Sequence, residues 1–378
     1  MPYDSLPDRP VWAEIDLSAI AFNVETIKAM LGPRTRLCAV VKADAYGHGA
    51  VPVAREALAA GADILAVAMA SEAVDLRKAG IEAPLIVLGH TPRPLAGLAA
   101  EWGFSTTVST LEEARAVAAA ALSRGVKVGV HLKLDTGMCR LGFDPRMAVP
   151  AAREIAGLDG LRIEGACSHL ATADSDLACA RGQLALFLRI IAEIEAEGVR
   201  VPLRHIANSA AAFSLPEARL DMARVGISLY GFQPGRPGDG GSAGLRPAMR
   251  IVALVSLVRD IPKGTGVGYG RTYIAPRPRR IAVLPIGYAD GLRRALSGRS
   301  GVGTPSGRAP FVGSICMDQC TVDVTDSPDI KAGDAVDILG GSGPSAEELA
   351  AILGTISYEV VSTVGRRVPR LYVYGRAA

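Results

Sequence analysis

An apolar run breaks into a Gly-rich turn in the stretch Leu37-Cys38-Ala39-Val40-Val41-Lys42-Ala43-Asp44-Ala45-Tyr46-Gly47-His48-Gly49. This pattern is typical of a buried strand that delivers one amine, that of Lys42, to the mouth of a pocket. Burial disfavours the charged form of a lysine, and a neutral amine condenses with an aldehyde. The alternative is a structural lysine that extends its ammonium from the strand end into water. The rest of the chain favours the reactive amine.

Seven further short apolar runs follow, and segments with helical periodicity separate them. Eight strands alternating with helices predict parallel βαβ units, and eight is the number that closes a (β/α)8 barrel. A doubly wound open sheet is the alternative, which the lack of a G-x-G-x-x-G motif after the first strand weakens. The expected strands are Leu37–Val41, Ile64–Ala68, Pro84–Leu88, Phe104–Val108, Val126–Leu134, Arg162–Ser168, Pro202–Ala207 and Asp221–Val225.

Two of the helical segments have clear end signals. The segment from Asp176 to Gly198 predicts a helix that Gly198 ends. Its apolar face is expected to hold Leu184, Phe187, Leu188, Ile191 and Ile194. A second helix is expected to open with a capping box at Thr110–Glu113.

The character of the chain changes after Gly231, where a Pro/Gly-rich linker occupies 234–242. A smaller, mostly-β domain with one helix at Ser345–Leu353 is expected beyond it. Its expected strands are Arg250–Val258, Ile281–Ile286, Phe311–Ile315, Cys320–Val324, Ala335–Leu339 and Leu371–Tyr374. The alternating segment Val11–Leu17 is expected to pair with this domain. The predicted domains are therefore a barrel at 14–240 and a β domain at 241–378 that includes the N-terminal strand 9–17.

Composition narrows the class of protein. The chain has 378 residues, of which 49% are hydrophobic and 21% charged, and a net charge of +3. There is no basic run with interleaved aromatics, so nucleic acid is not an expected partner. Neither a signal peptide nor a membrane span is expected, which favours a cytoplasmic protein. The six cysteines include no C-x-x-C pair and the five histidines lack metal spacing, so we expect buried free thiols and no metal.

Polar residues collect where the expected strands end, and the carboxyl ends of barrel strands form the active-site face. Ser209 begins a helical run and Gly226 allows close backbone approach, as in the phosphate sites that barrels build after strands seven and eight. A lysine that forms a covalent link beside a phosphate cradle suggests pyridoxal phosphate (PLP). The residues of this rim are Lys42, Tyr46, Lys133, Asp135, Arg140, His169, Asn208, Ser209, Arg224, Gly226 and Ile227.

The ordered set of motifs closely resembles the alanine racemase family, the two-domain members of the barrel-type PLP enzymes. The resemblance spans both domains and almost the whole chain. It rests on Val41–Gly49, Lys133–Gly142, Ser168–Asp174, Ala207–Ala210, Arg224–Gly231, Gly268–Gly270, Pro285–Gly291, Ile315–Cys320 and Tyr358–Glu359.

The resemblance implies the roles of individual residues. Lys42 holds PLP and is one catalytic base, and Tyr269 of the partner subunit in a homodimer is the other. The phosphate contacts are implied to be Tyr46, Ser209, Gly226, Ile227 and Tyr358, with Asn208 beside them. Arg224 faces the pyridine nitrogen, and His169 links Arg224 to the partner's Tyr269. Lys133 matches a position that is carbamylated in several family members.

The substrate site is implied by the same resemblance. Arg140 faces the substrate carboxylate and the phenolic oxygen of PLP. The entrance is shaped by Tyr288 of the partner subunit, Met317 of the partner subunit and Asp318 of the partner subunit. Racemisation removes a proton from one face of the α-carbon and returns it to the other, so two bases on opposite sides are expected.

The expected activity is therefore interconversion of L- and D-alanine, which would either supply D-alanine for peptidoglycan or serve catabolism. Three alternatives stay open at this point: a serine or broader-specificity racemase, an amino-acid decarboxylase on the same scaffold, and a PLP-binding protein with little catalysis. Proteins of the last kind end with the barrel, so the second domain argues against it.

Overall fold

The computed structural model describes residues 10–234 and 244–375 and divides the chain into two compact units. The barrel unit is Ile20–Arg246, and the C-terminal unit is Met1–Ala19 with Pro247–Ala378. Most of the expected 234–242 linker and the first nine residues lie outside the described residues. The expected boundary at 240 is displaced because Arg246 stays with the barrel unit: Asn23 Nδ2 donates to the Arg246 carbonyl (2.8 Å), and the Arg246 N–H donates to Asn23 Oδ1 (2.7 Å).

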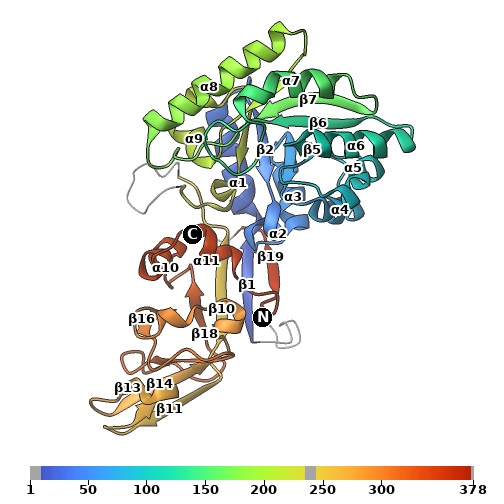
Figure 1. Ribbon diagram of the computed structural model, residues 1–378. Helices are drawn as coiled ribbons and strands as arrows, with labels where there is room; N and C mark the ends of the chain where they lie inside the picture. Colours follow the sequence, from blue (N-terminus) through green and yellow to red (C-terminus); the bar gives the residue numbers. More distant parts are fainter. Residues whose placement is uncertain (1–9, 235–243, 376–378) are drawn as a thin grey trace. The chain divides into compact units, whose positions relative to one another are not determined.

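Eight parallel strands form the centre of the barrel unit (Figure 1). In chain order they are β2 (Arg36–Val40), β3 (Ile64–Val67), β4 (Leu85–Val87), β5 (Ser105–Val108), β6 (Val128–Lys133), β7 (Leu161–Cys167), β8 (Leu203–His205) and β9 (Met222–Val225). The hydrogen-bonded order is β8-β7-β6-β5-β4-β3-β2-β9. Backbone bonds from Asp221 N to Arg204 O (3.2 Å) and from Arg224 N to Ala207 O (3.1 Å) join the two ends. The nearly closed barrel confirms the predicted fold class and excludes the open sheet.

Helices follow the strands and cover the outside of the barrel (Figure 1). They are α1 (Leu17–Leu31), which begins in the C-terminal unit, α2 (Lys42–Tyr46), α3 (Ala50–Ala59), α4 (Ala70–Lys78), α5 (Gly97–Trp102), α6 (Leu111–Ser123), α7 (Pro145–Ala156), α8 (Leu177–Ala196) and α9 (Ser209–Ser214). Asp176 caps α8 by accepting from the Cys179 N–H (3.0 Å). The expected apolar face of α8 is wrong at one position: Leu188 is exposed, and Ile190 is buried in its place.

Only one of the two hydrogen bonds of the expected capping box of α6 is present. Thr110 Oγ1 accepts from the Glu113 N–H (3.1 Å), as a capping residue should. The Glu113 carboxylate does not return the bond; it accepts from Ser109 N and Thr91 N, both at 2.9 Å. Glu113 therefore fastens the loops that follow β4 and β5.

The C-terminal unit is mostly β, as predicted. A six-stranded sheet has the order β16-β15-β18-β10-β1-β19, formed by β1 (Val11–Asp16), β10 (Met249–Leu254), β15 (Gly301–Thr304), β16 (Gly307–Pro310), β18 (Ala335–Leu339) and β19 (Arg370–Val373). A three-stranded sheet contains β11 (Leu257–Ile261), β14 (Arg279–Leu284) and β17 (Cys320–Asp323). A short ribbon pairs β12 (Gly266–Val267) with β13 (Tyr273–Ile274), and α10 (Ala346–Leu353) and α11 (Ser357–Ser362) complete the unit.

The pairing of β1 with β10 and β19 confirms the predicted role of the N-terminal strand. The expected strand Phe311–Ile315 is wrong: only Phe311 forms a bridge, to Val322, because Gly313 turns the chain with φ of +71°. The expected strand Arg250–Val258 is interrupted, and its residues divide between β10 and β11.

No helix within residues 10–234 and 244–375 is both long and apolar enough to cross a membrane. All six cysteines lie in these ranges as free thiols. Only Cys38, Cys167 and Cys320 are buried, so the expectation of buried thiols fails for the exposed Cys139 and Cys179.

Candidate active site

The barrel unit brings its predicted site residues to the carboxyl ends of the strands. Lys42 opens α2 directly after β2, and Lys133 is the last residue of β6. His169 follows β7 and Ser209 begins α9 after β8. Arg224 lies in β9, and Gly226 follows that strand. Because the carboxyl ends of barrel strands share one rim, these side chains form a single candidate site.

Lys42 is carried by an unusual backbone turn. The four residues Ala43, Asp44, Ala45 and Tyr46 have φ of 51°, 53°, 53° and 53°, which is a left-handed helical turn. This conformation costs non-glycine residues roughly 1–2 kcal/mol each. Sustained strain of this kind at the end of a buried strand marks a functional segment.

Hydrogen bonds from several elements hold this turn. The Ala45 N–H donates to the Val41 carbonyl (2.9 Å), and the Gly47 N–H donates to the Ala43 carbonyl (3.1 Å). Glu72 Oε1, from α4, accepts from the Ala43 N–H (2.5 Å). Asp44 Oδ1 accepts from the Ala50 N–H (2.7 Å) and ties the turn to α3.

Aromatic residues pack beneath the turn. The His48 Nδ1 atom lies 3.0 Å from the carbonyl oxygens of Ala45 and Tyr46. The His48 ring stacks on Tyr230 with ring centroids 4.5 Å apart, and the Tyr230 hydroxyl donates to the Val40 carbonyl (2.9 Å). Tyr230 thus connects the end of β2 to the turn that carries Lys42.

The surroundings of Lys42 favour its neutral form. Burial lowers the pKa of the Lys42 amine, and the positive charge of Arg140 lowers it further, while Glu72 opposes both. The Lys42 Nζ atom lies 5.9 Å from the centroid of the Tyr46 ring. Burial raises the pKa of Tyr46 to about 12, so this phenol keeps its proton and can donate a hydrogen bond.

Tyr46, Ser209 and Gly226 converge at one point of the rim. Ser209 Oγ accepts from the Gly226 N–H (3.0 Å), and Asn208 Oδ1 caps α9 by accepting from the Ala211 N–H (3.0 Å). A Cβ atom on Gly226 would lie 2.4 Å from the Tyr46 hydroxyl oxygen. The Tyr46 hydroxyl, the Ser209 hydroxyl and the Gly226 backbone can therefore lie close together only because Gly226 has no side chain.

Arg224 is a buried cation surrounded by neutral acceptors. Its Nη1 donates to the carbonyl oxygen of His205 (2.9 Å) and lies 2.7 Å from His205 Nδ1. Its Nη2 donates to the Ser168 and Ile206 carbonyls (2.7 and 3.2 Å) and lies 3.4 Å from His169 Nδ1. Within the part of the chain that the structure describes, no carboxylate forms an ion pair with Arg224.

The same part of the rim lowers the pKa values of Lys133 and His169. Burial, with the nearby Arg224 and Arg140, lowers the pKa of Lys133 to about 8. Burial and the surrounding cations, Arg224 first among them, lower the pKa of His169 to about 3.

The loop that carries Arg140 is fastened by one carboxylate. Asp135 Oδ1 accepts from the N–H groups of Gly137, Met138 and Cys139 at 2.9, 3.0 and 3.1 Å. This arrangement fixes the backbone immediately before Arg140, which itself is exposed.

The chemistry of this donor set fits PLP. The hydroxyls of Tyr46 and Ser209 and the open backbone at Gly226 suit a phosphate group. Arg224 can donate N–H hydrogen bonds to a ring nitrogen but does not give up a proton to it. The Lys42 amine, whose pKa is lowered by burial, suits a covalent link to an aldehyde.

The remaining predicted residues belong to the C-terminal unit. Tyr269 lies in a Gly-Tyr-Gly turn between Gly268 (φ +68°) and Gly270 (φ +70°), and 74% of its side chain is exposed. Tyr358 lies in α11.

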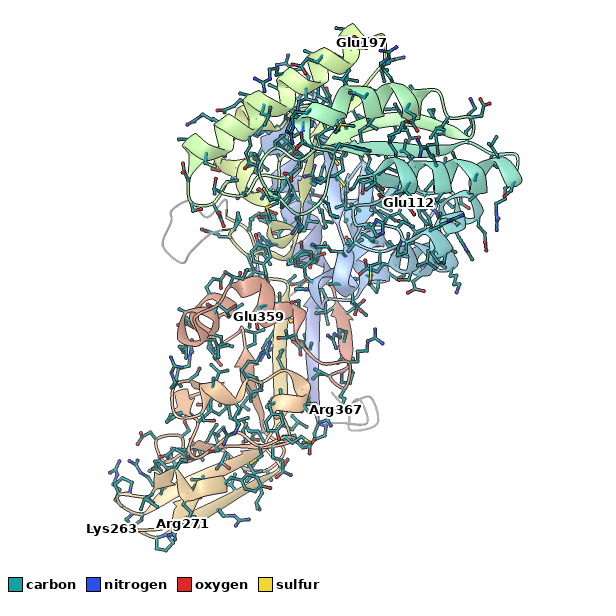
Figure 2. All side chains as sticks on the ribbon, in the orientation of Figure 1. Glu112, Glu197, Lys263, Arg271, Glu359 and Arg367 are labelled. Atoms are coloured by element: carbon teal, nitrogen blue, oxygen red, sulfur yellow. The ribbon has the colours of Figure 1, made fainter. Side chains whose placement is uncertain are left out.

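Tyr288, Met317 and Asp318 form one platform within the C-terminal unit. The N–H groups of Tyr288 and Ala289 donate to the carbonyls of Cys316 and Met317, both at 3.0 Å. Arg367, which is labelled in Figure 2, joins the two segments. It donates to Asp290 Oδ1 (3.0 Å) and to Asp318 Oδ1 (2.6 Å). The three residues expected at the substrate entrance are therefore held together.

Sequence reasoning missed the residues that support the site. Glu72, Tyr230 and Arg367 act through hydrogen bonds to distant segments, which no local pattern reveals. His131 and His205 carried a weak signal, since each interrupts an apolar strand with a buried polar side chain.

Comparisons with known proteins agree with this geometry. The family model "Alanine racemase, N-terminal domain" matches residues 15–234, and "Alanine racemase, C-terminal domain" matches residues 248–372. The chain belongs to the alanine racemase family. It is 48% identical to the alanine racemase of Desulfovibrio desulfuricans, over 97% of this chain and 99% of the relative. It is 46% identical to that of Desulforamulus reducens, with the same shares covered.

Solved structures of family members have the same fold. The alanine racemase of Streptomyces lavendulae superimposes with a TM-score of 0.93 at 40% identity, covering 98% of this chain and 99% of that one. The Bacillus anthracis alanine racemase with bound L-Ala-P superimposes with a TM-score of 0.90 at 35% identity, covering 98% and 96%. The match across both family domains disfavours the PLP-binding proteins that consist of a barrel alone. Among the described residues, no cluster of three or more His, Cys, Asp or Glu could hold a metal ion.

Proposed function

We propose that the protein is a PLP-dependent alanine racemase that interconverts L- and D-alanine and works as a homodimer in the cytoplasm. The observation that carries the proposal is the placement of Lys42 on a strained, multiply fastened turn at the same rim as the Tyr46–Ser209–Gly226 cradle and Arg224. Family membership supplies the substrate class.

The residues divide the work of proton transfer. When bound, PLP supplies an electron-withdrawing ring that acidifies the α-hydrogen of the amino acid. The Lys42 amine exchanges a proton at one face of the α-carbon, and the partner subunit's Tyr269 exchanges one at the other. Arg224 donates to the ring nitrogen without giving up its proton, and Arg140 orients the substrate carboxylate.

The exposed side chains of the C-terminal unit support the dimer. Tyr269, Met317 and Tyr288 are 74%, 52% and 42% exposed in the single chain. Large apolar side chains that gather in the open mark surfaces for another molecule. We propose that a partner's barrel rim covers them, and that Lys133, whose pKa is about 8, is the site of carbamylation.

The activity is tested by incubating the purified protein with each alanine enantiomer, with and without added PLP, and following chirality over time. We expect both enantiomers to reach the racemic mixture, at a rate that PLP increases. Absence of turnover in the PLP-loaded protein would refute the activity. Parallel reactions with L-serine test the broader-specificity alternative, and release of CO2 tests decarboxylation.

The shared site is tested by mixing two inactive variants, Lys42→Ala and Tyr269→Ala, under conditions that allow subunits to exchange. Each mixed dimer of two-fold symmetry carries one intact site, so about half of the dimers and roughly a quarter of the sites recover. If mass spectrometry confirms mixed dimers and no activity returns, Lys42 and Tyr269 act within one chain.

A further inference from the structure

The interior of the barrel contains two buried histidines, His131 and His205, that the proposed mechanism does not use. Together with Arg224 they form a polar row. His131 on β6 and His205 on β8 are 1% and 0% exposed. His205 Nε2 lies 3.0 Å from His131 Nδ1, and His205 Nδ1 lies 2.7 Å from Arg224 Nη1. Barrel interiors are normally filled by layers of branched apolar side chains. An apolar cluster on β2, β3, β4 and β9 does consist of buried apolar side chains, namely Cys38, Val40, Ile64, Ala66, Ile86 and Met222.

The strands are shaped to accommodate this row. The register of β6 and β7 shifts between Val130 and His131: Val130 pairs with Ile163, whereas His131 pairs with Gly165. Glu164 is therefore the extra residue of a bulge, a device that redirects a side chain. A Cβ atom on Gly165 would lie 2.8 Å from His131 Nδ1. A side chain at Gly165 would thus displace the His131 ring.

The row ends at a fixed carboxylate. Glu164 Oε2 lies 3.9 Å from His131 Nε2 and accepts from Ser105 Oγ (2.5 Å), and Glu164 Oε1 is paired with Arg162. The Glu164 side chain is 26% exposed, so this end reaches solvent. Lys133 and Arg224 are the cations that act on His205, and Glu164 and Arg224 act on His131.

The contacts determine where the hydrogens lie. Arginine only donates hydrogen bonds, so His205 Nδ1 must accept and carries no hydrogen. A neutral His205 then has its hydrogen on Nε2 and donates it to His131 Nδ1. His131 in turn carries its hydrogen on Nε2, directed toward the negative charge of Glu164. Burial lowers the pKa of both rings, to about 4 for His131, which agrees with two neutral imidazoles.

The contacts of this row also determine which N–H group of Arg224 is available to a ligand. His205 engages Nη1 through two atoms, and carbonyl oxygens with His169 engage Nη2. All hydrogen bonds found for Arg224 in the described residues use these two terminal nitrogens, so the Nε–H is the donor that remains.

We propose that His205 and His131 are positioning residues for Arg224, locked as neutral Nε2–H tautomers between the guanidinium and the Glu164 bulge, and that they present its Nε–H to the cofactor. The function in this proposal rests on the racemase activity proposed above. The tautomers do not, because the contacts that fix them lie within the barrel unit alone.

The test combines ring 15N NMR with kinetics. The chain has five histidines, so a sample labelled only at histidine gives few signals, and single substitutions assign them. We expect unprotonated Nδ1 and protonated Nε2 in His131 and His205, with and without PLP, from mildly acid to mildly alkaline pH. A His205 ring that carries hydrogen on Nδ1, or on both nitrogens, overturns the proposal.

Two variants of His131 separate positioning from packing. His131→Asn keeps an acceptor near the former Nδ1, whereas His131→Leu fills similar space without one. We expect His131→Leu to shift the 15N signal of His205 Nε2, which loses its acceptor, and to lower kcat about tenfold with little change in KM; His131→Asn should restore most of both. His90→Gln, at an exposed histidine outside the row, is the control and should change neither.

The outcomes are distinguishable. Equal kcat in the Leu, Asn and wild-type proteins refutes the positioning role. If His131→Leu does not fold, the tautomers measured in the wild-type protein and the kcat of His131→Asn still test the proposal. Wild-type protein with the expected tautomers but no alanine turnover refutes the proposed function and leaves the tautomer assignment intact.

Discussion

Replacing Gly226 with alanine tests whether Tyr46, Ser209 and Gly226 form one cradle for the phosphate. The added Cβ would lie 2.4 Å from the Tyr46 hydroxyl oxygen and 3.0 Å from its Cζ. Atoms in ordinary contact lie about 3.5–4.0 Å apart, so the Tyr46 hydroxyl must move by roughly 1 Å. The φ of Gly226 is −114°, which is outside the left-handed region that favours glycine. The perturbation is therefore steric and directed at one hydroxyl.

The size of the effect follows from what surrounds Tyr46. Its ring packs against Tyr230 with centroids 5.0 Å apart, so it has little room to retreat. Overpacking at such a site costs roughly 1–3 kcal/mol of stability. A displaced hydroxyl also loses its hydrogen bond to the charged phosphate, worth about 1.5–3 kcal/mol. We expect PLP to bind about 10- to 100-fold more weakly.

PLP affinity is measured by fluorescence titration of the cofactor-free protein, and stability by its thermal unfolding. Gly182→Ala is the matched control, because Gly182 lies exposed in α8 with open space at its Cβ position. That change should raise stability by up to about 1 kcal/mol and leave PLP affinity alone. In a Tyr46→Phe background the clashing oxygen is gone, so the affinity penalty of Gly226→Ala should shrink. The shared cradle would be refuted as a hypothesis if Gly226→Ala bound PLP as tightly as the wild type. It would also be refuted if the losses of PLP affinity in Gly226→Ala and Tyr46→Phe were additive in the double variant.

Three further predictions concern the support of the site. Glu72→Gln leaves one backbone N–H near the Lys42 turn without its charged acceptor, so racemisation should fall about tenfold while PLP still binds, as chirality assays and PLP titration will check. Phe187→Ala should lower the free energy of unfolding by about 3–5 kcal/mol, whereas the neighbouring exposed Leu188→Ala should change it little, both measured in urea. Burial lowers the pKa of His131 to about 4 in the folded protein. In the unfolded chain this histidine has an ordinary pKa of about 6.5, so between these two pH values the unfolded state binds more protons than the folded state. Stability should thus fall as the pH drops through this window, and less so in His131→Asn, by urea unfolding at pH of about 7 and about 4.5.

Much of the rim was predictable because parallel strands place their ends together. Lys42, His169, Ser209 and Arg224 each follow or end a recognisable apolar run, so the barrel topology alone assembles them. The strands themselves were clear because a barrel strand is buried on both faces and gives a continuous apolar segment.

The left-handed turn after Lys42 could not be predicted from its residues. Alanine, aspartate and tyrosine at 43–46 all prefer right-handed or extended backbone. The contacts that hold the turn are tertiary: Glu72 accepts from the Ala43 N–H, and His48 packs on Tyr230. The His131–His205 pair was equally hidden, since the two residues are far apart in the chain and only the order β6-β7-β8 brings them together.

The balance of charge at the rim explains why these residues suit an anionic occupant. Lys42, Lys133, Arg140 and Arg224 lower one another's pKa values or that of His169. The carboxylates nearest to them are already engaged: Glu72 accepts three backbone N–H groups, and Asp135 accepts three more. These carboxylates shape the backbone, and the cations keep an excess of positive potential. A phosphate and a carboxylate that enter the rim would supply the missing negative charge, so the rim suits the phosphate of PLP together with the carboxylate of an amino acid.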